Sequence, residues 1–297
     1  MNHKKFKSGY VSIIGIPNAG KSTIMNCICR EKLAITTDKP QTTRNRILAV
    51  VTSGSSQIIF LDTPGIHRSS KPVNRKIVHT AFETFAESDL VVYVVDASRK
   101  IGKDDELIME RMIDTDKKVI LVLNKVDLVK NKEELLPFIE KFRNKMEFSD
   151  IIPISALKGD NLDELVKTIE KHLPENPPFY PEDFLTDLPV KFFAGEIIRE
   201  KVFNMTHEEI PYSTAVTIDK FKEKDRSIEI FANINIERDS QKGIIIGKKG
   251  VLLKEIGTQS RIDIEEFTGK KVFLNLHVRV HKNWTKKPGA FKEYGIE

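Results

Sequence analysis

The stretch from Gly15 to Ser22 could bind phosphate. It reads Gly-Ile-Pro-Asn-Ala-Gly-Lys-Ser, the pattern G-x-x-x-x-G-K-S, and it follows an apolar run at 11–14. Glycines at both ends of the loop allow backbone angles in which successive N–H groups face a bound anion. A helix that begins near Lys21 adds the positive end of its dipole. The Lys21 amine can then reach the β- and γ-phosphates of a nucleotide, and the Ser22 hydroxyl can bind Mg²⁺.

A second candidate site follows the apolar run at 57–61. The residues Asp62-Thr63-Pro64-Gly65 form the short pattern D-x-x-G. An aspartate at the end of a strand can hold the Mg²⁺ shell, usually through water. The N–H of Gly65, on a flexible turn, can sense a γ-phosphate. The pattern is a weak signal alone, and it gains weight from its strand context and its distance behind the phosphate loop.

A third pattern could select a base. Asn124-Lys125-Val126-Asp127 closes an apolar run at 119–123. Its one carboxylate can accept from both the N1–H and the N2–H of guanine, a donor pair that adenine lacks. The stem of Lys125 can pack on the base, and the alternative is an ordinary charged loop. Further along, Ser155-Ala156-Leu157 offers a backbone N–H to guanine O6, which is a weak signal by itself.

A polar loop runs from Lys39 to Arg46 with the sequence Lys-Pro-Gln-Thr-Thr-Arg-Asn-Arg. A threonine in this loop could add a second protein hydroxyl to Mg²⁺ when a γ-phosphate is present. The alternative is a plain connector, and the residues alone leave both possibilities open.

The elements that must hold these residues alternate between strands and helices. Apolar runs predict strands at 11–14, 47–51, 57–61, 90–95, 119–123 and 151–154. Periodic stretches predict helices at 21–30, 72–87, 103–114, 132–146 and 161–172. This alternation is typical of an α/β fold with a mostly parallel six-stranded sheet covered on both faces. The short connection 52–56 predicts a hairpin, which makes one strand antiparallel. Ligands of such sheets bind beyond the carboxyl ends of the strands, where the patterns above lie.

The chain is long enough for two domains. It has 297 residues, of which 40% are hydrophobic and 31% charged, as in folded globular proteins. Five of the 13 prolines lie within 174–189, and proline stiffens extended chain. We therefore predict domains at 1–173 and 190–297, joined by a Pro-rich linker at 174–189.

Composition excludes some classes of protein. No apolar run reaches the ~18 residues needed to span a bilayer, and the basic start Met1–Lys7 has no apolar signal core behind it. We expect a cytoplasmic protein. The formal net charge is +5, and residues 190–297 hold 20 Lys and Arg against 16 Asp and Glu, which is a weak sign of a polyanionic partner. Cys27 and Cys29 do not share a helix face, and we interpret them as packing or surface residues rather than a metal pair.

The second half contains a pattern that could clamp RNA. A helix pattern at 190–199 is followed by strands near 213–221 and 227–237. The next stretch reads Ile244-Ile245-Ile246-Gly247-Lys248-Lys249-Gly250. It leads into a helix that ends near Phe267, and a strand at 272–280 completes the unit. Glycines allow close approach to a sugar-phosphate backbone, lysines can bind phosphate, and the isoleucine ridge can floor a groove for bases. The order α-β-β-α-α-β resembles the α+β type II KH domain, whose G-x-x-G loop clamps about four nucleotides of single-stranded RNA. The RNA-binding residues implied are Ile244, Ile246, Gly247, Lys248, Lys249 and Gly250.

The ordered motifs of the first half resemble the five G-motifs of translation-factor-related GTPases, which implies a P-loop GTPase domain. Two features resemble the Era subgroup in particular: Pro17-Asn18 before Ala19-Gly20-Lys21-Ser22, and the loop Gln41-Thr42-Thr43-Arg44. The resemblance covers about Tyr10 to Trp284. His277 departs from it, since an aromatic Trp is expected in the last strand.

This resemblance implies a set of site residues and cofactors. Catalytic roles fall to Lys21, Thr43 and Gly65; Mg²⁺ is held by Ser22, Thr43 and Asp62; and Asn18 helps to bind a K⁺ ion. Contacts to GTP or GDP are implied for Gly15, Asn18, Ala19, Gly20, Lys21, Ser22, Thr23, Asp62, Gly65, Asn124, Lys125, Asp127, Ser155, Ala156 and Leu157. We expect GTP and Mg²⁺ to order the loops 39–46 and 62–72, as in other GTPase switches.

The resemblance also implies partners. It predicts binding to the 3′ end of 16S rRNA, a role in maturation of the 30S ribosomal subunit, and no DNA partner. We expect a monomer. Peripheral association with the inner face of the cell membrane is implied by the resemblance alone, since no stretch of the sequence indicates it.

Ile66 keeps an alternative function open. Ras-type GTPases orient the attacking water with a Gln directly after D-x-x-G, and an aliphatic side chain cannot do this. We therefore expect slow intrinsic turnover, raised by K⁺ or by a partner. The alternative is a constitutive single-stranded RNA-binding module whose G domain senses nucleotide without turning it over, although intact Lys21, Ser22 and Asp62 argue against it.

Overall fold

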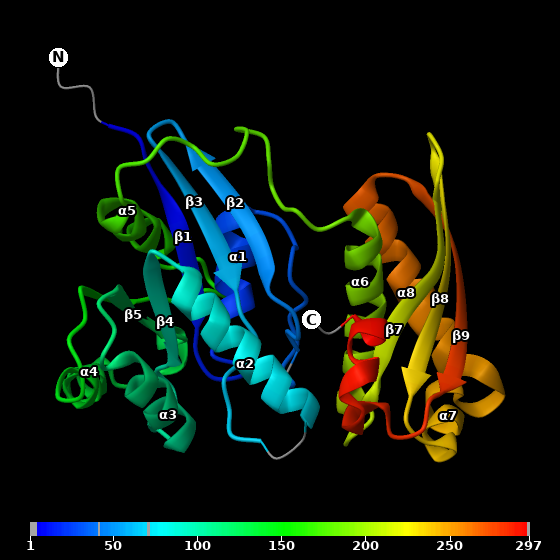
Figure 1. Ribbon diagram of the computed structural model, residues 1–297. Coiled ribbons are helices and arrows are strands. Elements are labelled where there is room, and N and C mark those ends of the chain that lie inside the picture. Colours follow the sequence, from blue (N-terminus) through cyan, green and yellow to red (C-terminus); the bar gives the residue numbers. More distant parts are fainter. Residues whose placement is uncertain (1–4, 41, 70–71, 296–297) are drawn as a thin grey trace. The chain divides into compact units, whose positions relative to one another are not determined.

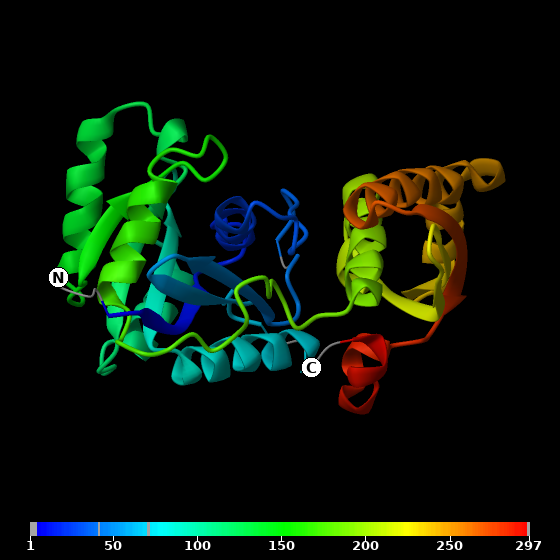
Figure 2. The same cartoon turned by 90° about the horizontal axis from the view of Figure 1, so that it is seen from above.

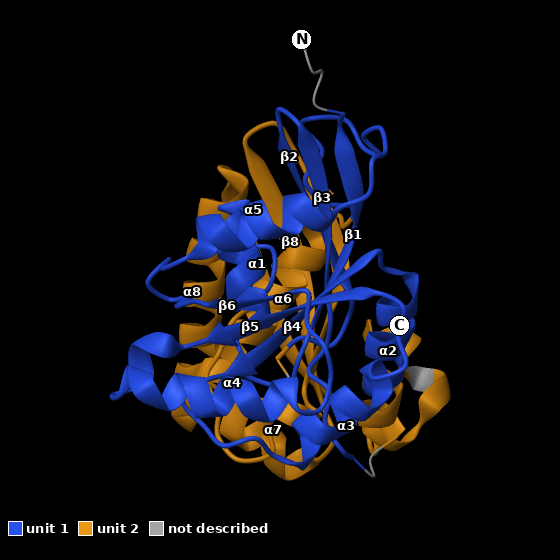
Figure 3. Ribbon diagram, turned by 90° about the vertical axis from the view of Figure 1, so that its left-hand side faces the viewer, with its two compact units in different colours: residues 1–34, 43–69, 78–187 blue, residues 35–42, 70–77, 188–297 orange. Residues whose placement is uncertain are grey.

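The computed structural model describes residues 5–40, 42–69 and 72–295. They form two compact units (Figure 3): one within 1–34, 43–69 and 78–187, the other within 35–42, 70–77 and 188–297. Gln41 of the predicted loop 39–46 lies outside the described residues. The domain boundaries predicted above stay predictions; of the described residues, 35–40 and 42 belong to the second unit.

A six-stranded sheet organises the first unit (Figure 1). Its strands are β1 Lys7–Ile14, β2 Ile47–Ser53, β3 Ser56–Asp62, β4 Leu90–Asp96, β5 Lys118–Asn124 and β6 Asp150–Pro153. The strand order is β2-β3-β1-β4-β5-β6. β2 pairs antiparallel with β3 through the predicted hairpin, and the other neighbouring pairs are parallel. The predicted α/β fold is confirmed.

Helices cover both faces of this sheet, as Figure 2 shows. They are α1 Lys21–Cys29, α2 Pro72–Glu87, α3 Lys103–Met112, α4 Leu135–Arg143 and α5 Leu162–His172. Residues of α2, α3 and α4 form one core layer with alternate residues of β4 and β5, among them Tyr93 and Leu121. Every residue of β3 and β4 is buried, which explains why these strands read as continuous apolar runs rather than alternating ones.

The parallel register brings the predicted ligand motifs to one edge. Ile13 lies opposite Asp62 and Asp96 lies opposite Asn124, so the loops that follow β1, β3 and β5 begin side by side. The sheet therefore positions residues that are far apart in the sequence at a single candidate site.

The Pro-rich segment docks on the first unit. The side chain of Gln57 accepts from the backbone N–H groups of Phe179 and Tyr180 at 2.8 and 3.0 Å. Tyr180 stacks on Phe184, and both rings pack against the apolar side chains of β2 and β3. Aromatic residues and one glutamine thus fix the Pro-rich segment to the first unit.

The second unit has the predicted order α-β-β-α-α-β. Its elements are α6 Val190–Met205, β7 Ala215–Glu223, β8 Ser227–Ile236, α7 Asp239–Ile246, α8 Val251–Thr268 and β9 Lys271–Val280. β8 pairs antiparallel with β7 and parallel with β9, which leaves β9 at an edge. The helices cover one face of this sheet over an isoleucine-rich core (Figure 2).

Short 3-10 turns complete the chain. They lie at Val126–Leu128, Lys132–Glu134, Pro211–Ser213, Lys248–Gly250, Trp284–Lys286, Pro288–Ala290 and Lys292–Tyr294. Trp284 is buried, and its indole N–H donates to the Ser213 carbonyl at 3.0 Å. Trp284 therefore packs inside the second unit. Among the described residues, no helix is both long and apolar enough to cross a lipid bilayer.

Candidate functional site

The phosphate loop has the geometry that its glycines predict. Gly20 has a φ of +97°, and a Cβ atom there would lie 2.1 Å from Asn124 Nδ2, so only glycine fits. The loop ends at Lys21, where α1 begins. The Lys21 amine is buried and donates to the carbonyls of Gly15 at 3.2 Å and Ile16 at 3.0 Å. Burial lowers the pKa of Lys21 to about 8, although the nearby Asp62 carboxylate opposes this shift.

Three oxygen-bearing side chains converge beside this loop. Ser22 Oγ donates to Asp62 Oδ2 at 2.6 Å and lies 2.9 Å from Thr43 Oγ1. They come from α1, from the end of β3 and from the loop before β2. The structure thus brings together the three side chains predicted to hold Mg²⁺.

One oxygen of this cluster has no partner. Asp62 is fully buried, and within the described part of the chain its Oδ1 atom makes no hydrogen bond. Burial raises the pKa of Asp62 to about 6, against the opposing effects of Lys21, Ser22 and the Thr63 backbone. A buried carboxylate with an unpaired oxygen is costly unless a cation compensates it. Two hydroxyls and a carboxylate are the hard oxygen ligands that suit Mg²⁺, so the residues fit this ion.

Asn124 links the loops around the base site. Its Nδ2 donates to the Ala19 carbonyl at 2.8 Å, and its Oδ1 accepts from the Ala156 N–H at 3.0 Å. This backbone N–H of the 155–157 loop is therefore already engaged, while the Leu157 side chain is exposed. The Lys125 amine pairs with Asp96 at 2.7 Å, which fixes its stem.

The carboxylate of Asp127 remains available. It lies in a 3-10 turn after β5 and is partly exposed. Among the residues that the structure describes, none donates a hydrogen bond to it. This is the acceptor that the N–H pair of guanine requires.

The loop after β3 places Gly65 against the phosphate loop and turns Ile66 inward. The Ile66 N–H donates to the Gly15 carbonyl at 3.1 Å. The Ile66 side chain is fully buried in the core layer under α2 and α3. It therefore occupies the core and has no polar group with which to orient water. His67 Nδ1 lies 3.0 Å from the Gly65 carbonyl, so this ring has a local structural partner.

The G-x-x-G loop forms a tight exposed turn in the second unit. Gly247 has a φ of +72°, and a Cβ atom there would lie 2.8 Å from Leu252 Cβ. Lys248 and Lys249 are exposed, whereas Gly250 caps the start of α8. The turn thus presents two cations next to an uncrowded helix N-terminus, which suits a phosphate-bearing strand.

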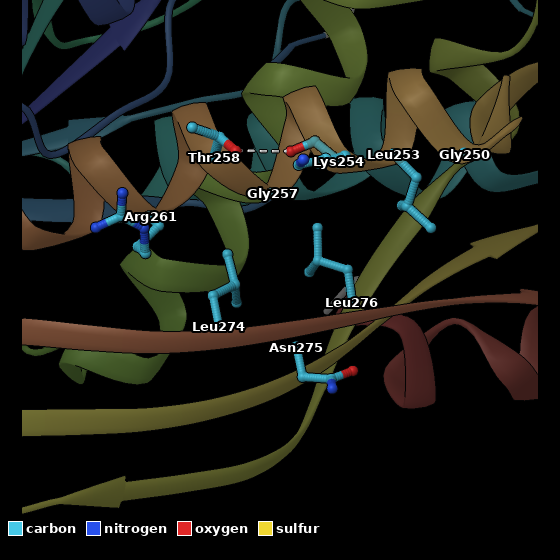
Figure 4. A pocket seen from close by; sticks show the side chains of 9 residues that line it. All are labelled: Gly250, Leu253, Lys254, Gly257, Thr258, Arg261, Leu274, Asn275 and Leu276. Atoms are coloured by element: carbon cyan, nitrogen blue, oxygen red, sulfur yellow. Dashed lines mark hydrogen bonds between the residues drawn. The ribbon is translucent and has the colours of Figure 1, made fainter. Parts of the chain in front are cut away.

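A groove of about 430 Å³ lies between α8 and the edge strand β9, as Figure 4 shows. Leu274 and Leu276 point from β9 toward α8, and Asn275 points to the other side (Figure 4). The nine lining residues are Gly250, Leu253, Lys254, Gly257, Thr258, Arg261, Leu274, Asn275 and Leu276. The groove therefore has an apolar floor, a small residue at its middle and cations along its wall.

Comparison with known proteins decides the family. The model for "50S ribosome-binding GTPase" matches residues 10–125, and the KH domain model matches residues 209–285. The GTPase Era of Syntrophus aciditrophicus is 51% identical over 98% of this chain and 95% of its own length. The chain belongs to the GTPase Era family. The GTPase Era of Geotalea uraniireducens is 48% identical over the whole of both chains.

Solved structures of this family share the whole architecture. A variant of Aquifex aeolicus Era bound to GDP·AlF₄⁻ has a TM-score of 0.94 and 42% identity, covering 98% of this chain and 99% of the other. A structure of Era with MgGDPNP and nucleotides 1506–1542 of 16S ribosomal RNA matches with the same TM-score, identity and coverage. The chain is therefore a GTPase with a P-loop domain and a KH domain, as the motifs predicted.

Sequence reasoning did not single out most of the residues that line this groove. Ile244 and Ile246 lie on α7 and are not among them; Ile244 is exposed, and the predicted contact of both residues with bases stays a prediction. A signal was present in the spacing 250, 253, 254, 257, 258 and 261, which places these residues on one face of a helix. That face is small and cationic rather than apolar, so it did not read as a core stripe.

The available Asp127 carboxylate predicts a base-specificity swap. In Asp127→Asn the amide replaces one acceptor with a donor, so guanine loses a charge-assisted pair of hydrogen bonds. We expect GTP affinity to fall on the order of 10²- to 10⁴-fold. Xanthosine triphosphate, which has a carbonyl in place of the 2-amino group, should bind this variant better than GTP. Titration calorimetry measures both affinities.

Asp163→Asn, an equal change at an exposed position of α5, is the matched control and should bind GTP normally. Unchanged GTP affinity in Asp127→Asn would show that this carboxylate does not read the base.

Proposed function

We propose that this chain is a GTP-hydrolysing switch protein that binds the 3′ end of 16S rRNA and assists maturation of the 30S ribosomal subunit. The observation that carries the nucleotide part is the cluster of Ser22, Thr43 and Asp62 with its unpaired buried oxygen. The groove between α8 and β9 beside the G-x-x-G loop supports the RNA part.

The residues of the chain divide the work on GTP. Backbone N–H groups of the loop 15–20 and the α1 N-terminus cradle the phosphates. Lys21 offsets charge on the β- and γ-phosphates, and the Gly65 N–H reports the γ-phosphate. When bound by Ser22, Thr43 and Asp62, Mg²⁺ supplies charge neutralisation at the phosphate oxygens. Asn124, Lys125, Asp127 and the 155–157 loop hold the base.

Hydrolysis by the chain alone should be slow. The Ile66 side chain is buried in the core, and the corresponding Gln of Ras-type GTPases orients the attacking water. Positioning must then come from Thr43, Gly65 and Lys21. Slow turnover suits a switch, because the GTP state lasts long enough for an RNA partner to be bound.

RNA contacts follow from the second unit. Lys248 and Lys249 supply phosphate contacts, which give affinity without sequence selection. Unstacked bases can lie on Leu274 and Leu276, with Arg261 at the far end of the helix face. The Era complex with 16S ribosomal RNA nucleotides supports the same type of target for this chain. A cytoplasmic location, a monomeric state and peripheral membrane contact stay predictions from the family resemblance.

A potassium dependence tests the predicted role of Asn18. Its backbone has a φ of +61° within the phosphate loop. If its side chain helps to hold K⁺ beside the phosphates, GTP turnover should be higher in KCl than in NaCl at equal ionic strength. Asn18→Ala should lose this difference between the two salts. Equal rates of the wild-type chain in the two salts would count against a K⁺ site.

RNA binding tests the whole proposal. We expect a fluorescent oligonucleotide of the 16S rRNA 3′ end to bind the full chain more tightly with Mg²⁺ and a non-hydrolysable GTP analogue than with GDP. Salt must be fixed, because phosphate contacts depend on it. Gly247→Asp should abolish binding, since it adds a charge and a Cβ that clashes with Leu252.

Two controls sharpen this measurement. Gly289→Asp adds the same charge in open space and should bind normally. The pair Lys248→Gln and Lys249→Gln changes only exposed side chains and should weaken binding without disturbing the fold. Equal tight binding in both nucleotide states would favour the constitutive RNA-binding module, and no binding in either state would contradict the RNA assignment.

A further inference from the structure

Thr36, Lys39 and Thr42, in the loop before Thr43, contact helix α6 of the second unit. The Thr36 N–H donates to Glu200 Oε1 at 3.3 Å. The Lys39 amine donates to the carbonyls of Phe203 and Thr206 at the end of α6, which are acceptors that a helix C-terminus leaves open. The loop therefore holds α6 through its charged side chain as well as through its backbone.

Arg199 makes the most deeply buried of these contacts. Its Nη2 donates to the Thr42 carbonyl at 2.5 Å, and the guanidinium also pairs with Glu196 through Nε and Nη2. The residue is 2% exposed and its charged group lies over the Phe203 ring. Within the described residues its Nη1 makes no hydrogen bond. A buried guanidinium with an unpaired donor depends strongly on the acceptors it retains, so the Thr42 carbonyl is a significant partner.

The Thr42 carbonyl belongs to the peptide that leads into Thr43. Because that peptide is planar, fixing the carbonyl also fixes the direction in which Thr43 starts. Thr43 is the residue whose hydroxyl lies 2.9 Å from Ser22 Oγ in the Mg²⁺ cluster. A second hydrogen bond steadies the same residue, since Thr42 Oγ1 donates to the Lys39 carbonyl at 2.8 Å.

Helix α6 also contacts the helix that forms the groove. Lys201 lies next in sequence to Glu200 and pairs with Asp263 of α8. The two helices share the isoleucine-rich core through residues such as Ile197 and Ile264. Helix α6 is thereby packed against α8, whose exposed face lines the groove.

We propose that Lys39 and Thr42 dock the loop before Thr43 on α6, and that Arg199, which holds the Thr42 carbonyl, is the positioning residue that links Thr43 to the RNA groove. This inference rests on the proposed function. In the state that holds Thr43 at the Mg²⁺ cluster, Arg199 captures the Thr42 carbonyl and α6 and α8 are held in the arrangement seen here. When Thr43 leaves the cluster, the hydrogen bond between Arg199 and the Thr42 carbonyl is lost, and the RNA-binding arrangement of α6 and α8 is no longer stabilised.

The test compares RNA affinity in two nucleotide states. The full chain is titrated with the 16S rRNA 3′-end oligonucleotide at fixed salt, with GDP or with Mg²⁺ and a non-hydrolysable GTP analogue. We expect the wild-type chain to prefer the GTP-analogue state by about fivefold or more. Arg199→Gln should bring this ratio close to unity while leaving the affinity in GDP unchanged. Arg199→Lys, which keeps one donor for the Thr42 carbonyl, should retain part of the ratio.

Two further variants keep the test decisive if Arg199→Gln unfolds in a circular dichroism melt. Lys39→Met changes a partly exposed side chain and should also lower the ratio. Lys191→Gln, at an exposed position of the same helix, is the matched control and should keep the wild-type ratio. A purely structural role would weaken RNA binding equally in both states, so the ratio separates the two explanations.

The outcomes are distinguishable. If the wild-type chain responds to nucleotide and the Arg199 and Lys39 variants respond equally, the docking inference is overturned and the proposed function stands. If the wild-type chain binds the oligonucleotide equally in both states, or not at all, the switch function itself fails and the docking inference fails with it.

Discussion

A carboxylate that is removed from water needs a partner for each of its oxygens. Asp62 has one for Oδ2, the Ser22 hydroxyl, and within the described structure none for Oδ1. Around it lie the Lys21 amine and the hydroxyls of Ser22 and Thr43, so the pocket is polar and buried. A cation at the unpaired oxygen would stabilise this arrangement, and Mg²⁺ is the cation that its oxygen ligands suit. The rest of the molecule depends on how this cluster is held.

The sheet holds two members of the cluster and a loop holds the third. Asp62 ends β3 and Ser22 lies on the helix that follows β1, so parallel pairing of these strands fixes both. Thr43 has no such support from a regular element. Its hydroxyl lies beside Ser22 Oγ, and the carbonyl of its neighbour Thr42 accepts from Arg199. A rigid pair with one adjustable ligand is what a nucleotide switch requires, because only the adjustable ligand can respond to the γ-phosphate.

Local sequence predicted the first unit well. Each strand of its sheet was expected within a few residues of its observed bounds, because strands buried on both faces read as short apolar runs between turn residues. The hairpin and the loop at Gly20 follow from local chemistry in the same way. The site residues gathered at the sheet edge because parallel topology leaves few other arrangements.

The remainder depends on contacts between distant residues. Arg199 and Thr42 are 157 residues apart, and nothing in either segment indicates the other. The groove between α8 and β9 was not expected for a related reason: its floor uses Leu274 and Leu276, whose direction is fixed only when β9 pairs at the edge of the sheet. The predicted RNA contact of Ile244, which is 52% exposed on α7, stays a prediction.

The central claim is that the Mg²⁺ cluster and the RNA groove are linked, and linkage is reciprocal. The most direct measurement is the affinity of the full chain for a fluorescent, non-hydrolysable GTP analogue with Mg²⁺, with and without a saturating 16S rRNA 3′-end oligonucleotide at fixed salt. We predict that the oligonucleotide raises the affinity for the analogue. The factor should equal the one by which the analogue raises RNA affinity over that of the nucleotide-free chain. The affinity for GDP should change less when the oligonucleotide is present. An analogue affinity that is identical with and without the oligonucleotide would contradict the account.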